Sequence, residues 1–355
     1  MTTTAADLIA DHADRLTDYV VDEDYRRRPE LEARYGEDGR ALYRRDNHFH
    51  LSFLREAVAS NEPALFADYV GWARSMLLAH GVLVEDLHIN LDLLCEALQQ
   101  LLPAEASAQA VATVRDAQRQ LPSLPAQPAT FMADDGSNVE LARAYLEHLL
   151  AGNRKQASDL VSEAVAGGLS LQALYLDVFQ RSQRELGRLW QLNRITVAEE
   201  HFCTAATQSI MNQCYRQILE TPRNGLRVTA LCIAGDLHEI GLRVIADFFE
   251  LAGWDCDYLG ANTPVASVLT QLEKRRPDLL AISATMPYHV RPVAELIDAL
   301  RANPSLVDIP VLVGGRPFLV SADLWRKIGA DGWAADAESA VARGIELVER
   351  GRGGH

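Results

Sequence analysis

Cysteine is scarce in this chain, and basic residues are outnumbered by acidic ones. Its 355 residues include five cysteines, and 34 Lys and Arg stand against 49 Asp and Glu, for a formal net charge of −15. The cysteines are scattered without a Cys-x-x-Cys pair, which argues against a disulfide framework or a zinc site and favours reduced, packed thiols. The acidic balance argues against direct nucleic-acid binding through a broad basic face.

Long apolar runs are absent as well. No stretch reaches the roughly 18 consecutive apolar residues of a membrane span, and the polar, acidic start of the chain lacks the apolar core of a signal peptide. From these absences we expect a cytoplasmic protein that makes no contact with membranes.

The pattern of apolar residues and turns divides the chain into three segments and a linker. Apolar residues recur at helical spacing up to about residue 120, which predicts an all-helical domain over 1–120. Residues 121–137 are rich in Pro, Ala and small polar residues, as is typical of a linker. A second helical domain is expected over 138–222, with the organisation of a four-helix bundle, and a third domain over 223–350.

The third domain alternates short apolar runs with amphipathic helical stretches. This pattern predicts a buried parallel sheet with helices on both faces, in a flavodoxin-like, doubly wound arrangement. The fold class is therefore α plus α/β. The predicted strands are 226–234, 254–259, 278–284, 309–313 and 331–335.

Three of these strands end in residues that suit a ligand site. The first strand is followed by Gly-Asp-Leu-His-Glu-Ile-Gly at 235–241, the third by Ser-Ala-Thr at 283–285, and the fourth by Gly314-Gly315. Ligands of such sheets bind at the carboxyl ends of strands, near the switch in strand order. We therefore expect the three turns to lie side by side and to form one site.

The order and spacing of the three turns resemble the cobalamin-binding domains of methionine synthase, corrinoid methyltransfer proteins and light-sensing repressors of the CarH type. Their signature is Asp-x-His-x-x-Gly, then about forty residues to a Ser, then somewhat under thirty to Gly-Gly. The resemblance implies a base-off, His-on corrinoid, with a nucleotide tail that enters the sheet. The residues it assigns to the cofactor are Asp236, His238, Gly241, Ser283, Thr285, Gly314 and Gly315.

The chemistry of the first turn agrees with this assignment. An imidazole nitrogen is a good ligand for cobalt, and its other ring nitrogen needs a partner that fixes its tautomer. Asp236 is placed to be that partner of His238. The alternative is that Asp236 and His238 only cap the helix that follows.

The second domain carries a further resemblance. Thr196-Val-Ala-Glu199 is a capping box that begins a helix, and Trp190 is followed, after nine residues, by Glu200-His201. This resembles the helical cap of the CarH-type photoreceptors, where the Trp packs on the adenosyl group of adenosylcobalamin and the Glu contacts it. The alternative is a core Trp and a solvated Glu at a helix start.

The chain departs from those repressors in two respects. In the repressors a His follows the Trp and becomes the upper cobalt ligand in the light, whereas here that residue is Gln191. There is also no winged-helix domain in front, so the repressor function does not carry over. Either the lit state then has water or His201 above cobalt, or this chain does not use that photochemistry.

The N-terminal domain resembles the globin-related sensor domains that, in the photocobilins, bring a bilin next to the corrinoid. The resemblance lies in the domain order and in a loose pattern of Tyr, Asp, His, Phe and Trp residues over 35–72. The propionates of a bilin need cations, and its pyrrole nitrogens need polar partners. We expect these from Arg44, Arg45, His48 and His50, with Tyr69 and Trp72 packing on the rings.

Two alternatives for this domain stay open. One is an ordinary helical core with surface arginines. The other is haem binding, since predicted helices or their ends carry His48, His50, His80 and His88. Cys95 lies in an apolar helical run, so we expect it to pack in the core and not to form a thioether link.

We therefore expect a non-enzymatic photoreceptor with adenosylcobalamin and biliverdin as chromophores. No output motif follows residue 350, so we expect the signal to pass through a light-dependent homo-oligomer or to a separate signalling protein. The alternatives are a corrinoid protein that shuttles methyl groups between methyltransferases, and a sensor of cobalamin concentration. Replacing Glu200 should separate photoreceptor from shuttle.

Overall fold

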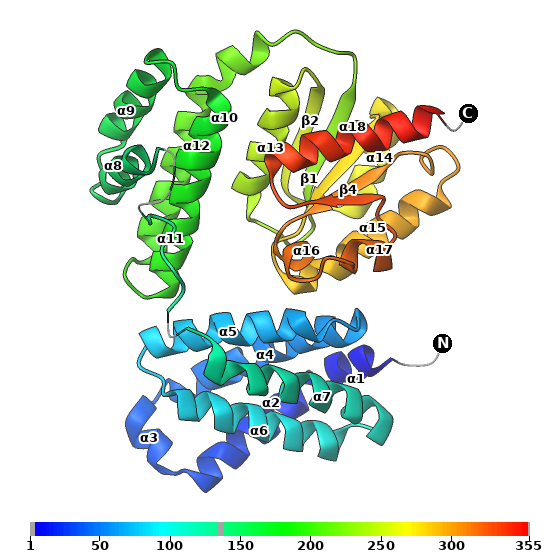
Figure 1. The fold of residues 1–355 in the computed structure, drawn as a ribbon. Coiled ribbons are helices and arrows are strands. Elements are labelled where there is room, and N and C mark those ends of the chain that lie inside the picture. The colour runs from blue at the N-terminus through cyan, green and yellow to red at the C-terminus, as the bar shows by residue number, and fades with distance from the viewer. Residues whose placement is uncertain (1–3, 126, 134–135, 137, 354–355) are drawn as a thin grey trace. The chain divides into compact units, whose positions relative to one another are not determined.

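The computed structural model describes residues 4–125, 127–133, 136 and 138–353, and the chain forms two units (Figure 1). Four residues of the predicted linker, 126, 134, 135 and 137, lie outside the described residues. The first unit comprises residues 1–126, 286–291 and 316–327. The second comprises residues 127–285, 292–315 and 328–355.

The N-terminal part of the first unit is helical, as predicted. Its apolar stripes meet in a core that includes the fully buried side chains of Leu16, Leu54 and Phe66. Pro63 occupies the first turn of its helix, where a missing N–H is not needed. The helices are α1 (Ala5–Asp11), α2 (Ala13–Arg27), α3 (Glu30–Tyr35), α4 (Gly39–Ala59), α5 (Pro63–Ala79), α6 (Val84–Leu101) and α7 (Ala104–Gln120).

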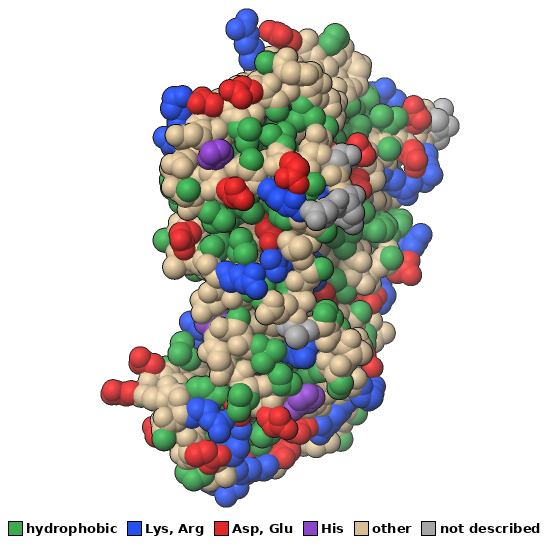
Figure 2. Space-filling view, turned by 60° about the vertical axis from the view of Figure 1, so that its left-hand side comes forward, with side chains coloured by type: hydrophobic (Ala, Val, Ile, Leu, Met, Phe, Trp, Pro, Cys, Tyr) green, Lys and Arg blue, Asp and Glu red, His purple; other side chains and the backbone are tan. Residues whose placement is uncertain are grey.

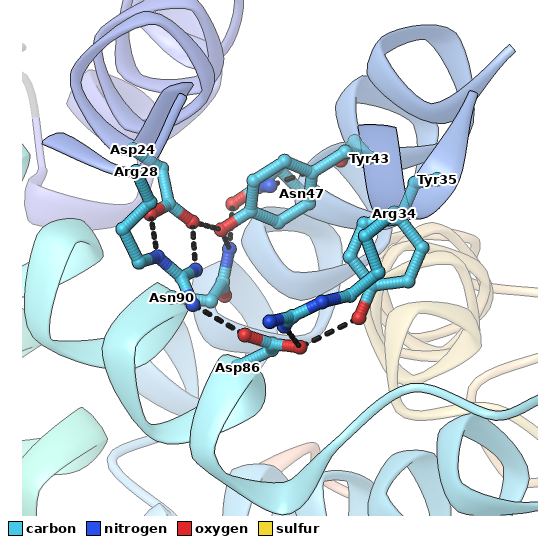
Figure 3. A network of polar contacts seen from close by, with 8 residues as sticks. All are labelled: Asp24, Arg28, Arg34, Tyr35, Tyr43, Asn47, Asp86 and Asn90. Carbon is cyan, nitrogen blue, oxygen red and sulfur yellow. Dashed lines mark hydrogen bonds and ion pairs between the residues drawn. The ribbon is translucent and has the colours of Figure 1, made fainter. Parts of the chain in front are cut away.

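A network of polar contacts joins α2, α3, α4 and α6 (Figure 3). Arg28, which follows α2, donates two hydrogen bonds of 2.6 Å to Asp24 and also pairs with Asp86. The Tyr43 hydroxyl donates to Asp24 at 2.7 Å and accepts from Asn90 at 3.0 Å. Because Asp24 is completely buried, its charge depends on these partners. Arg28 therefore serves the packing of these helices.

The second unit begins with helices that share a core around Tyr145, Leu174, Phe179 and Ile210. The predicted capping box is confirmed: the Thr196 hydroxyl accepts from the Glu199 N–H at 3.2 Å, and Glu199 accepts from the Thr196 N–H at 2.7 Å. The helical segments are α8 (Val139–Leu150), α9 (Arg154–Ala166), α10 (Leu171–Ala173), the π-helical η2 (Leu174–Gln180), α11 (Arg181–Gln191) and α12 (Val197–Leu219).

The sheet that follows is parallel, with strand order β2-β1-β3-β4-β5. The chain leaves β1 on one side and returns on the other to form β3, so the order switches between these two strands, as in flavodoxin-like folds. The predicted parallel sheet is confirmed. The strands are β1 (Arg227–Ile233), β2 (Asp255–Thr263), β3 (Leu279–Ser283), β4 (Val311–Gly314) and β5 (Gly332–Ala334).

Helices cover both faces of the sheet (Figure 1). Ala230 and Leu279 pack against α13 and α18 in one core, and the side chains that alternate with them, such as Leu280 and Ile282, are buried on the other face. The helices around the sheet are α13 (Glu239–Leu251), α14 (Val265–Arg275), α15 (Val290–Ala302) and α18 (Ala337–Gly353), whereas α16 (Arg316–Val320) and α17 (Leu324–Lys327) belong to the first unit.

The prediction for β2 was wrong in its length. The strand runs to Thr263 and not to 259, and its pairing with β1 shifts register between Ala230 and Ile233. Gly260 and Asn262 adopt positive φ angles of 74° and 51° there, which lets the irregular strand continue past the expected end.

Hydropathy and surface charge can be followed over the part of the chain that the structure describes. None of its helices is long and apolar enough to cross a membrane. On the face shown in Figure 2, Lys and Arg side chains are interspersed with Asp and Glu.

Candidate functional site

The turns after β1, β3 and β4 meet at the carboxyl edge of the sheet, as predicted. Ser283, the last residue of β3, pairs with Cys232 of β1 on one side and with Gly314 of β4 on the other. The Thr285 N–H donates to the Asp236 carboxylate at 2.7 Å, which ties the turn after β3 to the turn after β1. The switch in strand order lies between these two turns.

Asp236 is completely buried and orients His238. Its Oδ1 accepts the backbone N–H of His238 at 3.0 Å and lies 3.0 Å from His238 Nδ1, so the expected Asp–His contact is present. An Nδ1 that donates to the carboxylate leaves Nε2 as the unprotonated, ligating nitrogen. The His238 side chain is 56% exposed, so Nε2 is accessible to a ligand.

The electrostatics of this turn favour a basic imidazole. The hydrogen bond to Asp236 raises the pKa of His238 above its ordinary range, and the negative charge of Glu200 adds to this effect. Glu200 belongs to α12 and not to the sheet, so the start of α12 and the turn after β1 lie within electrostatic reach of each other.

Helix capping accounts for part of the motif. His238 is the N-cap residue of α13; its side chain makes no capping hydrogen bond, but the Asp236 carboxylate accepts the His238 backbone N–H at 3.0 Å. Asp236 also bonds to His238 Nδ1 and accepts the Thr285 N–H. The interpretation of the two residues as capping residues therefore explains the backbone contact of Asp236 and leaves its other two contacts unexplained.

Asn262 is a residue that the sequence reasoning missed. Its side chain accepts the Gly235 N–H at 2.8 Å, and its own N–H donates to the Asp236 carbonyl at 2.9 Å, so the end of β2 holds the turn after β1 in place. The signal in the sequence was an Asn close after a Gly at a strand end, because these two residue types tolerate positive φ.

The three glycines of the motif differ in what surrounds them. A Cβ on Gly315 would come within 2.0 Å of the Ala284 carbonyl oxygen, and one on Gly314 within 3.3 Å of the Ala334 carbonyl oxygen. The packing of the chain itself therefore disfavours side chains at 314 and 315. A Cβ on Gly241 would meet nothing within 4 Å, so only there is space left beside the turn.

Ser283 is buried at the carboxyl edge of the sheet. It pairs with Cys232 of β1, whose thiol donates to the His238 carbonyl at 3.8 Å. Burial raises the pKa of the Cys232 thiol to about 12, and a thiol with such a pKa is not a nucleophile at neutral pH. Cys232 is therefore a packing residue.

The predicted cap residues lie near one end of the helical layer. Glu200 accepts a hydrogen bond from the Thr204 hydroxyl at 2.7 Å, which fixes its carboxylate on the outside of α12. Trp190 is partly buried near the end of α11. The His201 side chain is 75% exposed, and its Nε2 lies 3.7 Å from Glu200.

In the first unit, the structure groups His50 with aromatic side chains. His50 is buried, with Nδ1 2.8 Å from the Tyr69 hydroxyl, and the Tyr69 ring stacks on Phe53 at 3.7 Å and near Trp72 at 6.2 Å. Burial lowers the pKa of His50 to about 4, so the imidazole is neutral at pH 7.

The other residues expected to hold a bilin are not brought together with His50. Arg44 pairs with Asp18 and His48 lies 3.5 Å from Asp14, both on α2. Arg45 pairs with its neighbour Asp46. Two residues on from His48, the helix has turned by roughly 200°, so His50 faces the opposite side of α4. Cys95 is buried, as expected.

A parallel sheet with this strand order, an Asp-oriented imidazole at its switch point and helices before it are the features expected of cobalamin-binding domains. Comparison with known families agrees: residues 226–342 match the family described as "B12 binding domain". Residues 141–215 match a second family with the same description. The sheet and the helices that precede it are therefore both parts of B12-binding domains.

Individual relatives cover the same region. Over 125 aligned positions, this chain is 37% identical to the HTH-type transcriptional repressor CarA of Myxococcus xanthus. The alignment covers 34% of this chain and 41% of the repressor. The chain is also 29% identical over 130 positions to dimethylamine corrinoid protein 1 of Methanosarcina mazei, across 36% of this chain and 58% of that protein. The chain thus spans about half the length of these relatives.

A solved structure shares the fold. The monomethylamine corrinoid protein of Methanosarcina barkeri aligns over 59% of this chain and 100% of its own length, with a TM-score of 0.53 and 21% sequence identity. At that identity the likeness concerns the fold alone.

Proposed function

We propose that this chain is a cobalamin-dependent photoreceptor that binds adenosylcobalamin in the base-off, His-on form. The observation that carries the proposal is the exposed His238 imidazole, oriented by the buried Asp236 and close enough to Glu200 of α12 for that charge to raise its pKa. The bound cofactor would supply a cobalt–carbon bond that visible light cleaves.

The residues at the edge of the sheet suit the lower face of a corrinoid. His238 Nε2 would bind cobalt, while Asp236 holds the ring in the required tautomer. The open space beside Gly241 and the hydroxyl of Ser283 would receive the nucleotide tail, with the backbone of Thr285 and of Gly314-Gly315 beside it. Leu237, 71% exposed, would pack against the ring.

The cap would contact the upper face. Trp190 would pack on the adenosyl group and Glu200 would accept hydrogen bonds from it. Gln191 is buried, so we expect water or the exposed His201 to take the upper position after illumination. When the adenosyl group leaves, the cap loses a packing partner, and a repacked cap would change the association of the chain with itself or with a separate signalling protein.

A bilin would serve as the second chromophore. The aromatic cluster of Phe53, Tyr69 and Trp72 offers ring faces, and the neutral His50 offers a polar group. Arg44, Arg45 and His48 would pair with propionates only if they exchanged their present carboxylate partners. The cluster around Tyr69 therefore carries this part of the proposal.

The proposal is tested by absorption spectra of the protein reconstituted with adenosylcobalamin and biliverdin, in the dark and after green light. We expect loss of the cobalt–carbon band in the light and a protein-bound, red-absorbing pigment. Corrinoid bands without pigment uptake would remove the bilin. Lack of corrinoid binding, or unchanged binding in His238→Ala, would overturn the cobalamin site.

A second candidate is a corrinoid protein that shuttles methyl groups between methyltransferases. It is supported by the similarity to the dimethylamine corrinoid protein and by the fold shared with the monomethylamine corrinoid protein. A shuttle should prefer methylcobalamin and should tolerate Glu200→Gln, whereas the photoreceptor should lose affinity for adenosylcobalamin in this variant.

A further inference from the structure

Glu239, the residue after His238, accepts three hydrogen bonds from two other elements of the second unit. Its Oε1 accepts a hydrogen bond from Gln208 of α12 at 2.9 Å. Its Oε2 accepts from the Tyr258 hydroxyl and from the Ala261 N–H of β2, both at 3.2 Å. Glu239 is the first residue of α13, yet its carboxylate is used to join α12, α13 and β2.

The backbone of β2 leaves room for this carboxylate. Gly260 has a φ of 74°, and a Cβ there would lie 3.2 Å from Glu239 Oε2, closer than an ordinary van der Waals contact. The irregular end of β2 therefore accommodates the Glu239 carboxylate as well as placing Asn262 against Gly235. The same stretch of backbone supports His238 and anchors Glu239.

Gln208 lies on the same side of α12 as Glu200. Glu200, Thr204 and Gln208 form an i, i+4, i+8 row, in which Thr204 holds Glu200 and Gln208 holds Glu239. Eight residues of helix span about 12 Å. Because α12 is one continuous helix, the position of Gln208 determines that of Glu200.

Among the described hydrogen bonds between α12 and α13, the one from Gln208 to Glu239 is therefore the nearest along α12 to Glu200 and the nearest along α13 to His238. Helices α12 and α13 run side by side (Figure 1), and two further described hydrogen bonds connect them. These bonds, from Arg243 to Asn212 at 3.0 Å and from Tyr215 to Glu250 at 3.5 Å, lie further along both helices.

We propose that the Gln208–Glu239 hydrogen bond sets the gap between the cap and the cobalt-ligand turn, and so selects cobalamins by the size of their upper ligand. The inference rests on the proposed function, because it takes His238 as the lower ligand and Glu200 as an upper contact. Gln208 and Glu239 are positioning residues: they act through α12 and through the turn. Losing the bond lets α12 move away from the sheet, which weakens contacts to a large upper ligand and leaves the Asp236–His238 pair intact.

The test compares the dissociation constants of adenosylcobalamin and hydroxocobalamin, measured in the dark, for wild type and Gln208→Leu. We expect the affinity for adenosylcobalamin to fall about fivefold, the effect of roughly one hydrogen bond. The affinity for hydroxocobalamin and the His-on absorption spectrum should be unchanged. Glu239→Ala should act in the same direction, because it removes the acceptor of the Gln208 side chain.

Gln217→Leu is the matched control, because Gln217 is an exposed glutamine on the same helix. If the ratio of the two dissociation constants in Gln208→Leu equalled the ratio in wild type and in Gln217→Leu, the role proposed for the Gln208–Glu239 hydrogen bond would be overturned. An equal loss of affinity for both cobalamins would overturn it too. If wild type bound neither cobalamin, the proposed function itself would fail, which these measurements distinguish from failure of the role proposed for this hydrogen bond.

Discussion

At the scale of single residues, the buried carboxylate of Asp236 contributes most to the geometry of the site. It accepts hydrogen bonds from His238 and from Thr285 across two strands, so it fixes the imidazole and the shape of the edge together. Replacing a residue that hydrogen-bonds to a metal-binding histidine usually lowers the affinity for the metal by about 10- to 100-fold.

We therefore expect Asp236→Asn to weaken hydroxocobalamin binding by about 10- to 100-fold, because an amide does not fix the ring tautomer as a carboxylate does. Equilibrium titration followed by absorbance measures this. Asp308→Asn, at an exposed aspartate, is the control. Equal affinities in the two variants would contradict the role given to Asp236.

His50 should make stability depend on pH. In the folded chain its pKa is lowered to about 4 by burial, whereas in the unfolded chain it is near 6.5. The unfolded state therefore binds a proton first as the pH falls, and the folded state loses stability between pH 6.5 and 4. The loss amounts to about 3 kcal/mol at most.

Urea unfolding of wild type and His50→Gln, at pH 7.5 and pH 4.5, measures this contribution. Wild type should lose more of its free energy of unfolding than the variant between the two pH values, since glutamine does not titrate. An equal loss in both proteins would show that His50 is not buried in its neutral form.

At the scale of elements, one glycine at the carboxyl edge is required by the packing of the chain, whereas another leaves space for a ligand. Gly241 lies in the first turn of α13 with open space beside it, whereas Gly315 is crowded by Ala284 at a φ of 105°. Alanine in a helix is more favourable than glycine by roughly 0.5–1 kcal/mol.

Gly241→Ala should therefore raise the thermal stability of the cofactor-free protein slightly and lower its affinity for cobalamin. Gly315→Ala should destabilise the cofactor-free protein itself. Thermal unfolding and cobalamin titration of both variants test this. Unchanged cobalamin affinity in Gly241→Ala would mean that the nucleotide tail lies elsewhere.

The elements also show what could be predicted from the sequence. Continuous apolar runs and helical spacing are local signals, so the parallel sheet and the N-terminal helices followed from them. The contacts of Asn262 and Glu239 join residues that are far apart in the sequence, and the register shift of β2 that places Asn262 depends on two positive φ angles. Neither the apolar pattern nor the spacing of motifs contains that information.

In the N-terminal helices, the sequence indicated residue types but not their directions. Arg44, His48 and His50 lie within one stretch of α4, yet the first two face α2 and the third faces Tyr69. Which face of a helix is buried was a matter of how α2, α4 and α5 pack, and a loose motif could not decide it.

At the scale of the whole molecule, the proposed function requires that light change association. With adenosylcobalamin bound, we expect size-exclusion chromatography with light scattering to give different masses in the dark and after green light, either for the chain alone or with a signalling partner. His238→Ala, treated in the same way, should show no difference. Constant mass and constant partner binding in wild type would favour the methyl shuttle.

The claim on which all of this depends is that His238 is the lower ligand of cobalt. It is tested most directly by electron paramagnetic resonance of protein-bound cob(II)alamin, prepared with ¹⁵N-labelled and unlabelled histidine. An axial ¹⁴N nucleus splits each cobalt line into three, and ¹⁵N splits it into two. We predict threefold splitting with unlabelled protein and twofold splitting with ¹⁵N-histidine. Threefold splitting in both samples would mean that the benzimidazole of the cofactor stays on cobalt, which would contradict the account.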